Sequence, residues 1–401
     1  MPSRRQYLAA LAAAGGIGTA AYVAASESGV GDALDGDVCP DRRSPRWQLN
    51  GEGWSPAVVD GGRVYVSERW GYTGTDDPSR IAAVDTYHGH AAWADTVVGG
   101  GAGIPLVTDD AVFVGTGIDT VLALERETGH RRWTWDAGGV EEYGGGAWGQ
   151  PTRVDDRVVV GVSHSTDPRA DPTDPTDYRH RLVALDAADG TLGWEFPVDD
   201  QVTHGPITRD GVVVGGTDAG RLYGVDAATG DRRFSTTIDG EPAVPPQLVD
   251  GRVVVLSSGG TLLSLDPSTG DERWRSRPVA DGVDLSVGTD VFVVGGRAGR
   301  VAAVDPASGD LRWTWTTESA LASVATGTDQ RVGMTYALDA RGVVHVLTPE
   351  GRRRRRFRVA ERVADRCGWN PQFDRATAVT LDRESLYVTG PFVARIETRD
   401  P

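Results

Sequence analysis

The sequence predicts an all-β fold, an eight-bladed β-propeller with four strands in each blade. Three observations lead to this prediction: a repeat of about 40 residues, a turn signature within the repeat, and a strand-like N-terminal segment that the last copy lacks. The 53 glycines and 22 prolines among the 401 residues fit many short strands joined by tight turns.

The repeat is followed most easily through the aromatic residue that ends each copy. These residues are Trp93, Trp133, Trp194, Phe234, Trp274 and Trp313, at intervals of 40, 61, 40, 40 and 39 residues. The long interval contains two extra segments, at residues 141–148 and the Pro/Asp-rich residues 167–177. A seventh copy at residues 342–355 keeps Gly351 but has lost the aspartate and the tryptophan.

Each copy has the pattern of a β-hairpin. A Leu-x-Ala-Leu alternation predicts a strand with one buried face. The Asp-x-x-Thr-Gly that follows predicts a turn, because Asp accepts backbone N–H bonds and Gly supplies a positive φ. The turn aspartates are Asp85, Asp186, Asp226, Asp266 and Asp305. We expect the final aromatic residue to pack between blades, and the upstream pair of strands, as in residues 246–256, gives four strands per repeat.

The number of blades follows from the inner strands. Six of their starts are marked by prolines and two lie near other residues: Pro56, Pro105, Pro151, Pro206, Pro246, Pro371, Val287 and Val324. The eighth copy lacks an outer strand, and we expect residues 46–49, which carry Trp47, to supply it and remove the free sheet edge. A seven-bladed ring is the alternative.

The charge pattern narrows the function classes. The formal net charge is −16, the acidic residues are 42 Asp and 15 Glu, and all 41 basic residues are Arg. A surface rich in Asp and free of Lys is similar to that of halophilic proteins, although a GC-rich genome also favours Arg over Lys. The negative field argues against nucleic acid as the partner.

The N-terminus has the features of an export address. Arg4 and Arg5 precede an apolar run to Ala25, which predicts a twin-arginine-type signal or anchor at residues 1–25. A polar linker at residues 26–45 and a propeller at residues 46–401 follow. We therefore expect an exported, monomeric ring that is extracellular or held outside by an N-terminal membrane anchor, and signal cleavage stays open. Cys39 and Cys367 form either one disulfide or two free thiols.

The motif Leu-x-Ala-Leu-Asp-x-x-Thr-Gly-x-x-x-Trp resembles the tryptophan-docking repeats of PQQ-like propellers over residues 46–396. That superfamily includes quinoprotein alcohol dehydrogenases and the non-enzymatic, BamB-like propellers. The resemblance implies the fold and not an activity. Quinoprotein dehydrogenases usually carry an adjacent Cys-Cys pair, whereas Cys39 and Cys367 are 328 positions apart. No matching Asp base with Glu and Asn metal ligands stands in the sequence, so the site residues do not support PQQ.

Candidate ligand-binding residues lie in the loops that lead into the inner strands. They are Trp54, Glu141, Glu142, Tyr143, Trp148, Gln150, His204, Glu241, Trp369 and Asn370. Glu141, Glu142 and Tyr143 could hold a cation or a sugar, or form a solvated acidic loop. Packing is the alternative role of the tryptophans. No catalytic residue and no metal motif is predicted.

The run of five arginines at residues 352–356 has two interpretations: the outer strand of the seventh blade, or a contact for a lipid headgroup or a glycan. The functional expectation is a non-enzymatic, exported scaffold that binds a protein or an envelope polymer at the cell surface. The alternatives are a PQQ-dependent quinoprotein-like oxidoreductase with a divergent site, and a hydrolase or lyase that uses Glu141 and Glu142.

Overall fold

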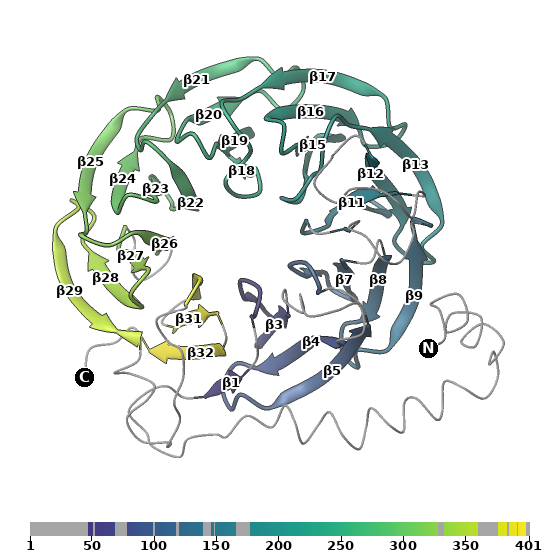
Figure 1. Cartoon of the computed structure of the whole chain (residues 1–401), viewed down its shortest axis with the longest axis horizontal. Coiled ribbons are helices and arrows are strands. Elements are labelled where there is room, and N and C mark those ends of the chain that lie inside the picture. The colour runs from purple at the N-terminus through teal and green to yellow at the C-terminus, as the bar shows by residue number, and fades with distance from the viewer. Residues whose placement is uncertain are drawn as a thin grey trace.

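Short runs of alternating or continuous apolar residues give this chain strands. The computed structural model describes residues 47–50, 53–68, 78–98, 101–117, 120–138, 146–147, 149–165, 177–327, 333–359, 376–382, 385–390 and 392–397. Within them, 32 strands form eight four-stranded antiparallel sheets around a common centre (Figure 1). The eight-bladed propeller is therefore confirmed, and the seven-bladed alternative is wrong.

Each blade runs from an inner strand to an outer strand. Blade 1 contains β2 (Val58–Asp60), β3 (Arg63–Ser67), β4 (Pro78–Asp85) and β5 (Ala91–Val98), and blade 2 contains β6 (Leu106–Val107), β7 (Ala111–Gly115), β8 (Thr120–Glu125) and β9 (Arg131–Asp136). Blade 3 contains β10 (Thr152–Val154), β11 (Arg157–His164), β12 (Arg179–Asp186) and β13 (Leu192–Pro197), and blade 4 contains β14 (Ile207–Arg209), β15 (Val212–Gly216), β16 (Arg221–Asp226) and β17 (Arg232–Thr237).

The second half of the ring repeats this order. Blade 5 contains β18 (Gln247–Val249), β19 (Arg252–Leu256), β20 (Leu262–Leu265) and β21 (Glu272–Ser276), and blade 6 contains β22 (Gly282–Val287), β23 (Phe292–Gly296), β24 (Arg300–Val304) and β25 (Leu311–Thr316). Blade 7 contains β26 (Leu321–Thr326), β27 (Thr335–Asp339), β28 (Val343–Leu347) and β29 (Arg353–Arg358), and blade 8 contains β30 (Ala378–Asp382), β31 (Ser385–Thr389), β32 (Phe392–Glu397) and β1 (Gln48–Asn50).

Blade 8 is completed by a strand from the other end of the chain. β1 pairs antiparallel with β32, so that Gln48 lies opposite Ala394 and Asn50 opposite Phe392 (Figure 1). Trp47 is buried, and its Nε1 donates to the carbonyl oxygen of Thr86 in blade 1 at 2.9 Å. The predicted closure by the N-terminal strand is confirmed, and it pairs the outer edge of β32.

The hydrophobic core lies between the blades. Among the described residues the buried apolar side chains form eight clusters, and each cluster joins two neighbouring blades. One of them combines Trp47 and Tyr387 of blade 8 with Val64 and Ala82 of blade 1. Because every sheet is covered on both faces in this way, the ring is held by apolar burial at each junction.

One aromatic side chain on an outer strand contacts the hairpin turn of the next blade at most junctions; we call these residues the docking aromatics. They are Trp47, Trp93, Trp133, Trp194, Phe234, Trp274 and Trp313. A Cβ atom on the facing turn glycine would lie 2.3–3.0 Å from the docking side chain, and these glycines have φ of +73° to +80°. The six tryptophans also donate Nε1–H to a turn carbonyl at 2.7–3.2 Å. Glycine is therefore required at each of these positions for two reasons: its positive φ and the close approach of the aromatic ring.

The turn aspartates hold the hairpins by accepting backbone N–H bonds. Asp226 Oδ1 accepts from the N–H groups of Ala228 and Thr229, both at 2.9 Å, and its other oxygen pairs with Arg233. The side-chain hydrogen bond from Arg233 and these backbone bonds lower the pKa of Asp226 to about 2.

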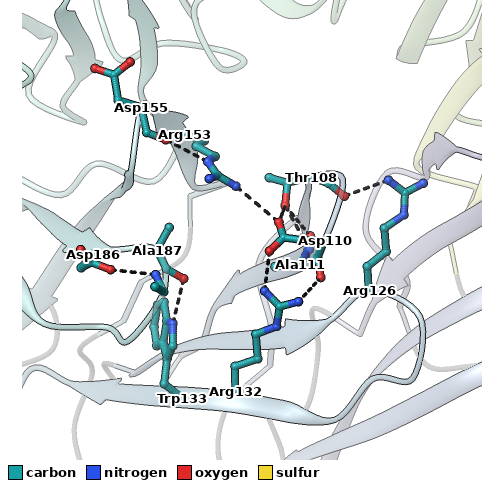
Figure 2. A network of polar contacts seen from close by, with 11 residues as sticks. Thr108, Asp110, Ala111, Arg126, Arg132, Trp133, Arg153, Asp155, Asp186 and Ala187 are labelled. Atoms are coloured by element: carbon teal, nitrogen blue, oxygen red, sulfur yellow. Dashed lines mark hydrogen bonds and ion pairs between the residues drawn. The ribbon is translucent and has the colours of Figure 1, made fainter.

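A second charged contact at the same end of the ring is seen at blades 2 and 3. In Figure 2, Arg132 and Arg153 converge on Asp110, with N–O distances of 2.6 and 3.6 Å, beside the bond from Trp133 to Ala187. The hydrogen bond from Arg132 is the main cause that lowers the pKa of Asp110.

Two inner strands begin earlier than predicted. β22 starts at Gly282 and β26 at Leu321, and each has six residues, whereas the inner strands of blades 1–5 have two or three. A proline precedes each of those shorter strands. Proline has no N–H to donate to a neighbouring strand, and it restricts the backbone of the residue before it. Pro371 lies outside the described residues, and β30 begins at Ala378.

The loss of tryptophan in the seventh copy follows from the closure of the ring. Arg355 in blade 7 is equivalent to Trp313 in blade 6. Arg355 lies opposite Val346 in β28, as Trp313 lies opposite Ala303 in β24. A docking aromatic at position 355 would need a hairpin turn between the last two strands of blade 8. Those strands, β32 and β1, come from opposite ends of the chain and share no hairpin.

Candidate functional site

The connections between strands divide into two sets, at opposite ends of the blades. Because neighbouring strands are antiparallel, the turn between the second and third strands of a blade lies at the same end as the connection to the next blade. We call this end the loop face, and the opposite end, which carries the Asp-x-x-Thr-Gly turns, the turn face. All the sequence-predicted ligand candidates precede inner strands, and the described ones belong to the loop face.

The structure describes four of these candidates. His204 lies in the connection from β13 to β14, and Glu241 lies in the connection from β17 to β18. Gln150 donates from Nε2 to the carbonyl oxygen of Pro105 at 2.9 Å, which ties two inner strands together. Trp54 is 2% exposed and lies under the Arg80 guanidinium at 5.1 Å, so packing accounts for it. The others lie outside the described residues: Glu141, Glu142, Tyr143, Trp148, Trp369 and Asn370. Cys39 and Cys367 lie outside them as well.

Asp218 lies close to two of the candidates, His204 and Glu241. It lies in the turn between β15 and β16, where Thr203 Oγ1 donates to its Oδ1 at 2.7 Å. The same hydroxyl lies 3.3 Å from His204 Nδ1. Burial raises the pKa of the Asp218 carboxyl, and the negative charges of Glu241 and Asp200 raise it further. On the loop face of blades 3–5, Asp200 and Glu241 therefore lie near enough to Asp218 for their charges to act on it.

A second polar chain reaches the same cluster from blade 3. Ser163 Oγ lies 2.8 Å from His180 Nδ1, and His180 Nε2 lies 4.0 Å from Asp200 Oδ1. This is a Ser-His-Asp sequence of contacts, but Ser163 is 3% exposed and lies within β11. A serine nucleophile must be accessible to its substrate, so the buried Ser163 does not fit that role.

Other carboxylates on the loop face bind neighbouring hydroxyls. Asp239 accepts from Ser257 Oγ at 2.7 Å and from Thr261 Oγ1 at 2.8 Å. Asp284 joins blades 6 and 7 by accepting from Ser323 Oγ at 2.6 Å, and burial raises its pKa. These bonds fix the loops and leave the Asp200, Asp218 and Glu241 group, which we call the carboxylate cluster, as the candidate site.

Sequence reasoning placed Glu241 and His204 at this face but missed Asp218, Asp200 and His180. Asp218 stands in a Thr-Asp-Ala-Gly turn that has the composition of any turn. Ser163 and His180 meet only because β11 and β12 pair in the register that sets them opposite each other. The sequence alone carries no signal of that register.

A metal-dependent cofactor site draws ligands from side chains such as those of His, Cys, Asp and Glu. Among the described residues, no group of three His, Cys, Asp or Glu side chains is arranged to hold a metal. The two cysteines of the sequence, 328 positions apart, cannot form an adjacent pair.

The propeller, its docking aromatics and its closure define the class of protein: a PQQ-like repeat propeller. The sequence profile described as outer membrane protein assembly factor BamB matches residues 32–168 and 179–398, so the chain belongs to this family. No curated protein sequence matches the chain.

Solved structures show the same fold. BamB from Moraxella catarrhalis is 18% identical, with a TM-score of 0.63 over 89% of this chain and 98% of that chain. The computationally designed Ika8 protein is 15% identical, with a TM-score of 0.63 over 91% and 98%. Quinohemoprotein alcohol dehydrogenase from Comamonas testosteroni is 13% identical, with a TM-score of 0.63 over 92% and 79%. At these identities the likeness concerns the fold alone.

No helix among the described residues is long and apolar enough to cross a bilayer, and the predicted signal or anchor at residues 1–25 lies outside them.

Proposed function

We propose that this chain is an exported, non-enzymatic scaffold that binds a protein partner through the loop face of blades 3–5. Membership of the BamB family supports a binding role, because the family is described as an assembly factor of the outer membrane. The twin arginine at Arg4 and Arg5 supports export, and a position outside the cytoplasmic membrane, free or anchored, follows from it.

The observation that carries the proposal is the carboxylate cluster. Burial and the charges of Glu241 and Asp200 raise the pKa of Asp218, and Thr203 Oγ1 donates to it at 2.7 Å. Like charges placed together lower the stability of the isolated fold, and such groups concentrate where a ligand compensates them. The complementary partner is a protein segment that carries Arg or Lys side chains.

Charge-neutral variants test this role without removing the hydrogen bond from Thr203. Asp218→Asn combined with Glu241→Gln keeps the side-chain shapes, and the variant should be at least as stable as the wild type because the repulsion is gone. Asp109→Asn is the matched control, because Asp109 is an exposed carboxylate in a hairpin on the turn face. We expect cross-linked envelope partners to be captured by the wild type and the control and lost with the double variant. Equal capture by all three proteins would overturn the assignment of the site.

A thermal-shift titration tests the alternative of a PQQ-dependent enzyme. The probes are PQQ with Ca²⁺ and PQQ with a lanthanide ion, and we expect no saturable rise in melting temperature. A bound ligand at one hundred times its dissociation constant would stabilise the fold by about 2.7 kcal/mol. A saturable rise in melting temperature that corresponds to this free energy would favour a quinoprotein-like oxidoreductase over the scaffold proposal. Capture of a polysaccharide in place of a protein would change the partner class to an envelope polymer.

A further inference from the structure

A cavity of about 590 Å³ opens at the rim of the ring between blades 6 and 7. Its walls come from β25 on one side and from β28 and β29 on the other, which are neighbours in Figure 1. The end of β25 contributes Trp315, and the turn before β28 contributes Arg341. The cavity lies far along the ring from the carboxylate cluster of blades 3–5, and it falls within the size range of ligand pockets.

The lining is basic, in a protein whose net charge is −16. Four arginines line it: Arg341, Arg353, Arg356 and Arg358. No carboxylate of the described residues forms an ion pair with Arg341, Arg353 or Arg356, and Glu318 and Asp339 are the acidic residues of the lining.

The hairpin turn of blade 7 also differs in charge from the turns of blades 4, 5 and 6. In blades 4, 5 and 6 the arginine seven positions after the turn aspartate pairs with it, as Arg273 does with Asp266 at 2.6 Å and Arg312 with Asp305 at 2.8 Å. In blade 7 the turn begins with Thr348, which carries no charge. Blade 7 therefore has no carboxylate at the turn position that pairs with an arginine in those three blades.

Asp339 forms no ion pair with Arg341, Arg353 or Arg356, because its oxygens bond to other groups. It accepts from the backbone N–H of Arg341 at 2.9 Å and of Val343 at 3.0 Å, and it bonds His345 Nε2 at 2.9 Å. Burial is the largest single effect on the pKa of Asp339 and raises it, but these bonds together outweigh burial and lower the pKa. The carboxylate thus fixes the imidazole ring of His345 in the wall.

His345 supplies a second, independent sign of a ligand. It is 4% exposed, lines the cavity and lies opposite Arg356 in the sheet. Its Nδ1 is buried with no hydrogen-bond partner, while Nε2 is bonded to Asp339. A buried polar atom without a partner is unfavourable, and a ligand oxygen or hydroxyl would satisfy it in either protonation state. The Trp315 ring lies 5.0 Å from the imidazole and adds an aromatic wall, with Phe357 nearby in the lining.

We propose that this cavity binds an acidic saccharide, a sugar that carries carboxylate or sulfate groups. The guanidinium groups match planar oxyanions in two parallel hydrogen bonds, His345 Nδ1 reaches a sugar oxygen, and Trp315 offers a flat face to the ring. The site is independent of the loop-face partner. Its ligand would hold the rim of the ring to an anionic polysaccharide.

The test is isothermal titration calorimetry on the full chain with trigalacturonate and with a sulfated heparin tetrasaccharide. Maltotriose is the neutral control, and inorganic sulfate is the control for a bare anion. We expect saturable binding of at least one acidic saccharide, weaker binding as the salt concentration rises, and none of maltotriose.

Variants locate the binding. Arg353→Gln combined with Arg356→Gln should weaken it at least tenfold, and Trp315→Ala should weaken it as well. Arg232→Gln is the matched control, because Arg232 is exposed on the outer strand of blade 4 and should leave the affinity unchanged. Circular dichroism confirms that each variant is folded.

Three results would overturn the proposal. They are the failure of both acidic saccharides to bind the wild type, equal affinity in the double arginine variant, and sulfate binding as tightly as the saccharides. The last result would reduce the cavity to a simple anion site.

Discussion

Phe234 is the docking aromatic without an indole. The residue opposite it in the sheet also differs from the residue at that position in other blades. Gly224 pairs with Phe234, whereas alanine pairs with the tryptophan in four other blades, as Ala184 does with Trp194. A Cβ atom at position 224 would lie 2.1 Å from Phe234 Cε1. We infer that the phenyl ring of Phe234 occupies the space that alanine fills in the other blades.

A double-mutant cycle measures this dependence. Gly224→Ala alone should destabilise the protein by about 2 kcal/mol, because overpacking typically costs about 1–3 kcal/mol while the backbone of this strand accepts alanine. Gly224→Ala with Phe234→Trp rebuilds the alanine–tryptophan pair. The new Nε1–H gains a carbonyl acceptor in the turn before Gly270, which contributes about 1 kcal/mol. The indole gains this bond in the Phe234→Trp single variant as well, so the expected coupling energy is the relieved overpacking, about 2 kcal/mol.

Guanidinium unfolding followed by far-UV circular dichroism gives the four free energies of unfolding. The slopes must agree across the four proteins for the comparison to hold. Additive effects, within about 0.5 kcal/mol, would refute the inference that Gly224 is fitted to the phenyl ring.

Three further predictions concern the closure and the turns. Trp47→Ala should destabilise by more than the roughly 3–5 kcal/mol expected for a buried tryptophan, and by more than Trp194→Ala, because Trp47 also holds the closing strand; equal denaturation midpoints would show that closure adds nothing. Asp226 has a folded-state pKa of about 2, below its ordinary 3.8, so its ionised form stabilises the turn above pH 3.8 and that contribution is lost as the pH falls toward 2. The melting-temperature gap between the wild type and Asp226→Asn should therefore narrow over this window, and a gap that is constant with pH would contradict the assignment. Arg355→Trp should not raise the melting temperature, because blade 8 offers no turn glycine; a clear rise would mean that an indole finds another partner there.

The repeat made the fold predictable, because the spacing of the docking aromatics and the turn glycines carries the geometry of each junction. Even the closing strand could be predicted, since Trp47 is the aromatic residue that blade 8 lacks. Inner strands were harder to place: without a proline, nothing in the sequence marked Gly282 or Leu321 as a start.

The candidate sites were predictable only in part. His204 and Glu241 were found because they precede inner strands, but Asp218 became visible only when two loops met across blades 4 and 5. The arginine run was noticed in the sequence. Its enclosure with His345 and Trp315 depends on the register of β28 and β29 and on the neighbouring blade.

The pairing of β1 with β32 makes the completion of the ring a late event in folding. The two strands are separated by most of the chain, so their contact carries the largest loop-closure entropy in the molecule. Blades 1–7 are each continuous in sequence and can form from local hairpins as the chain emerges. β1, by contrast, has no partner until residues 392–397 are available. β32 must therefore be synthesised before the open arc can become a closed ring.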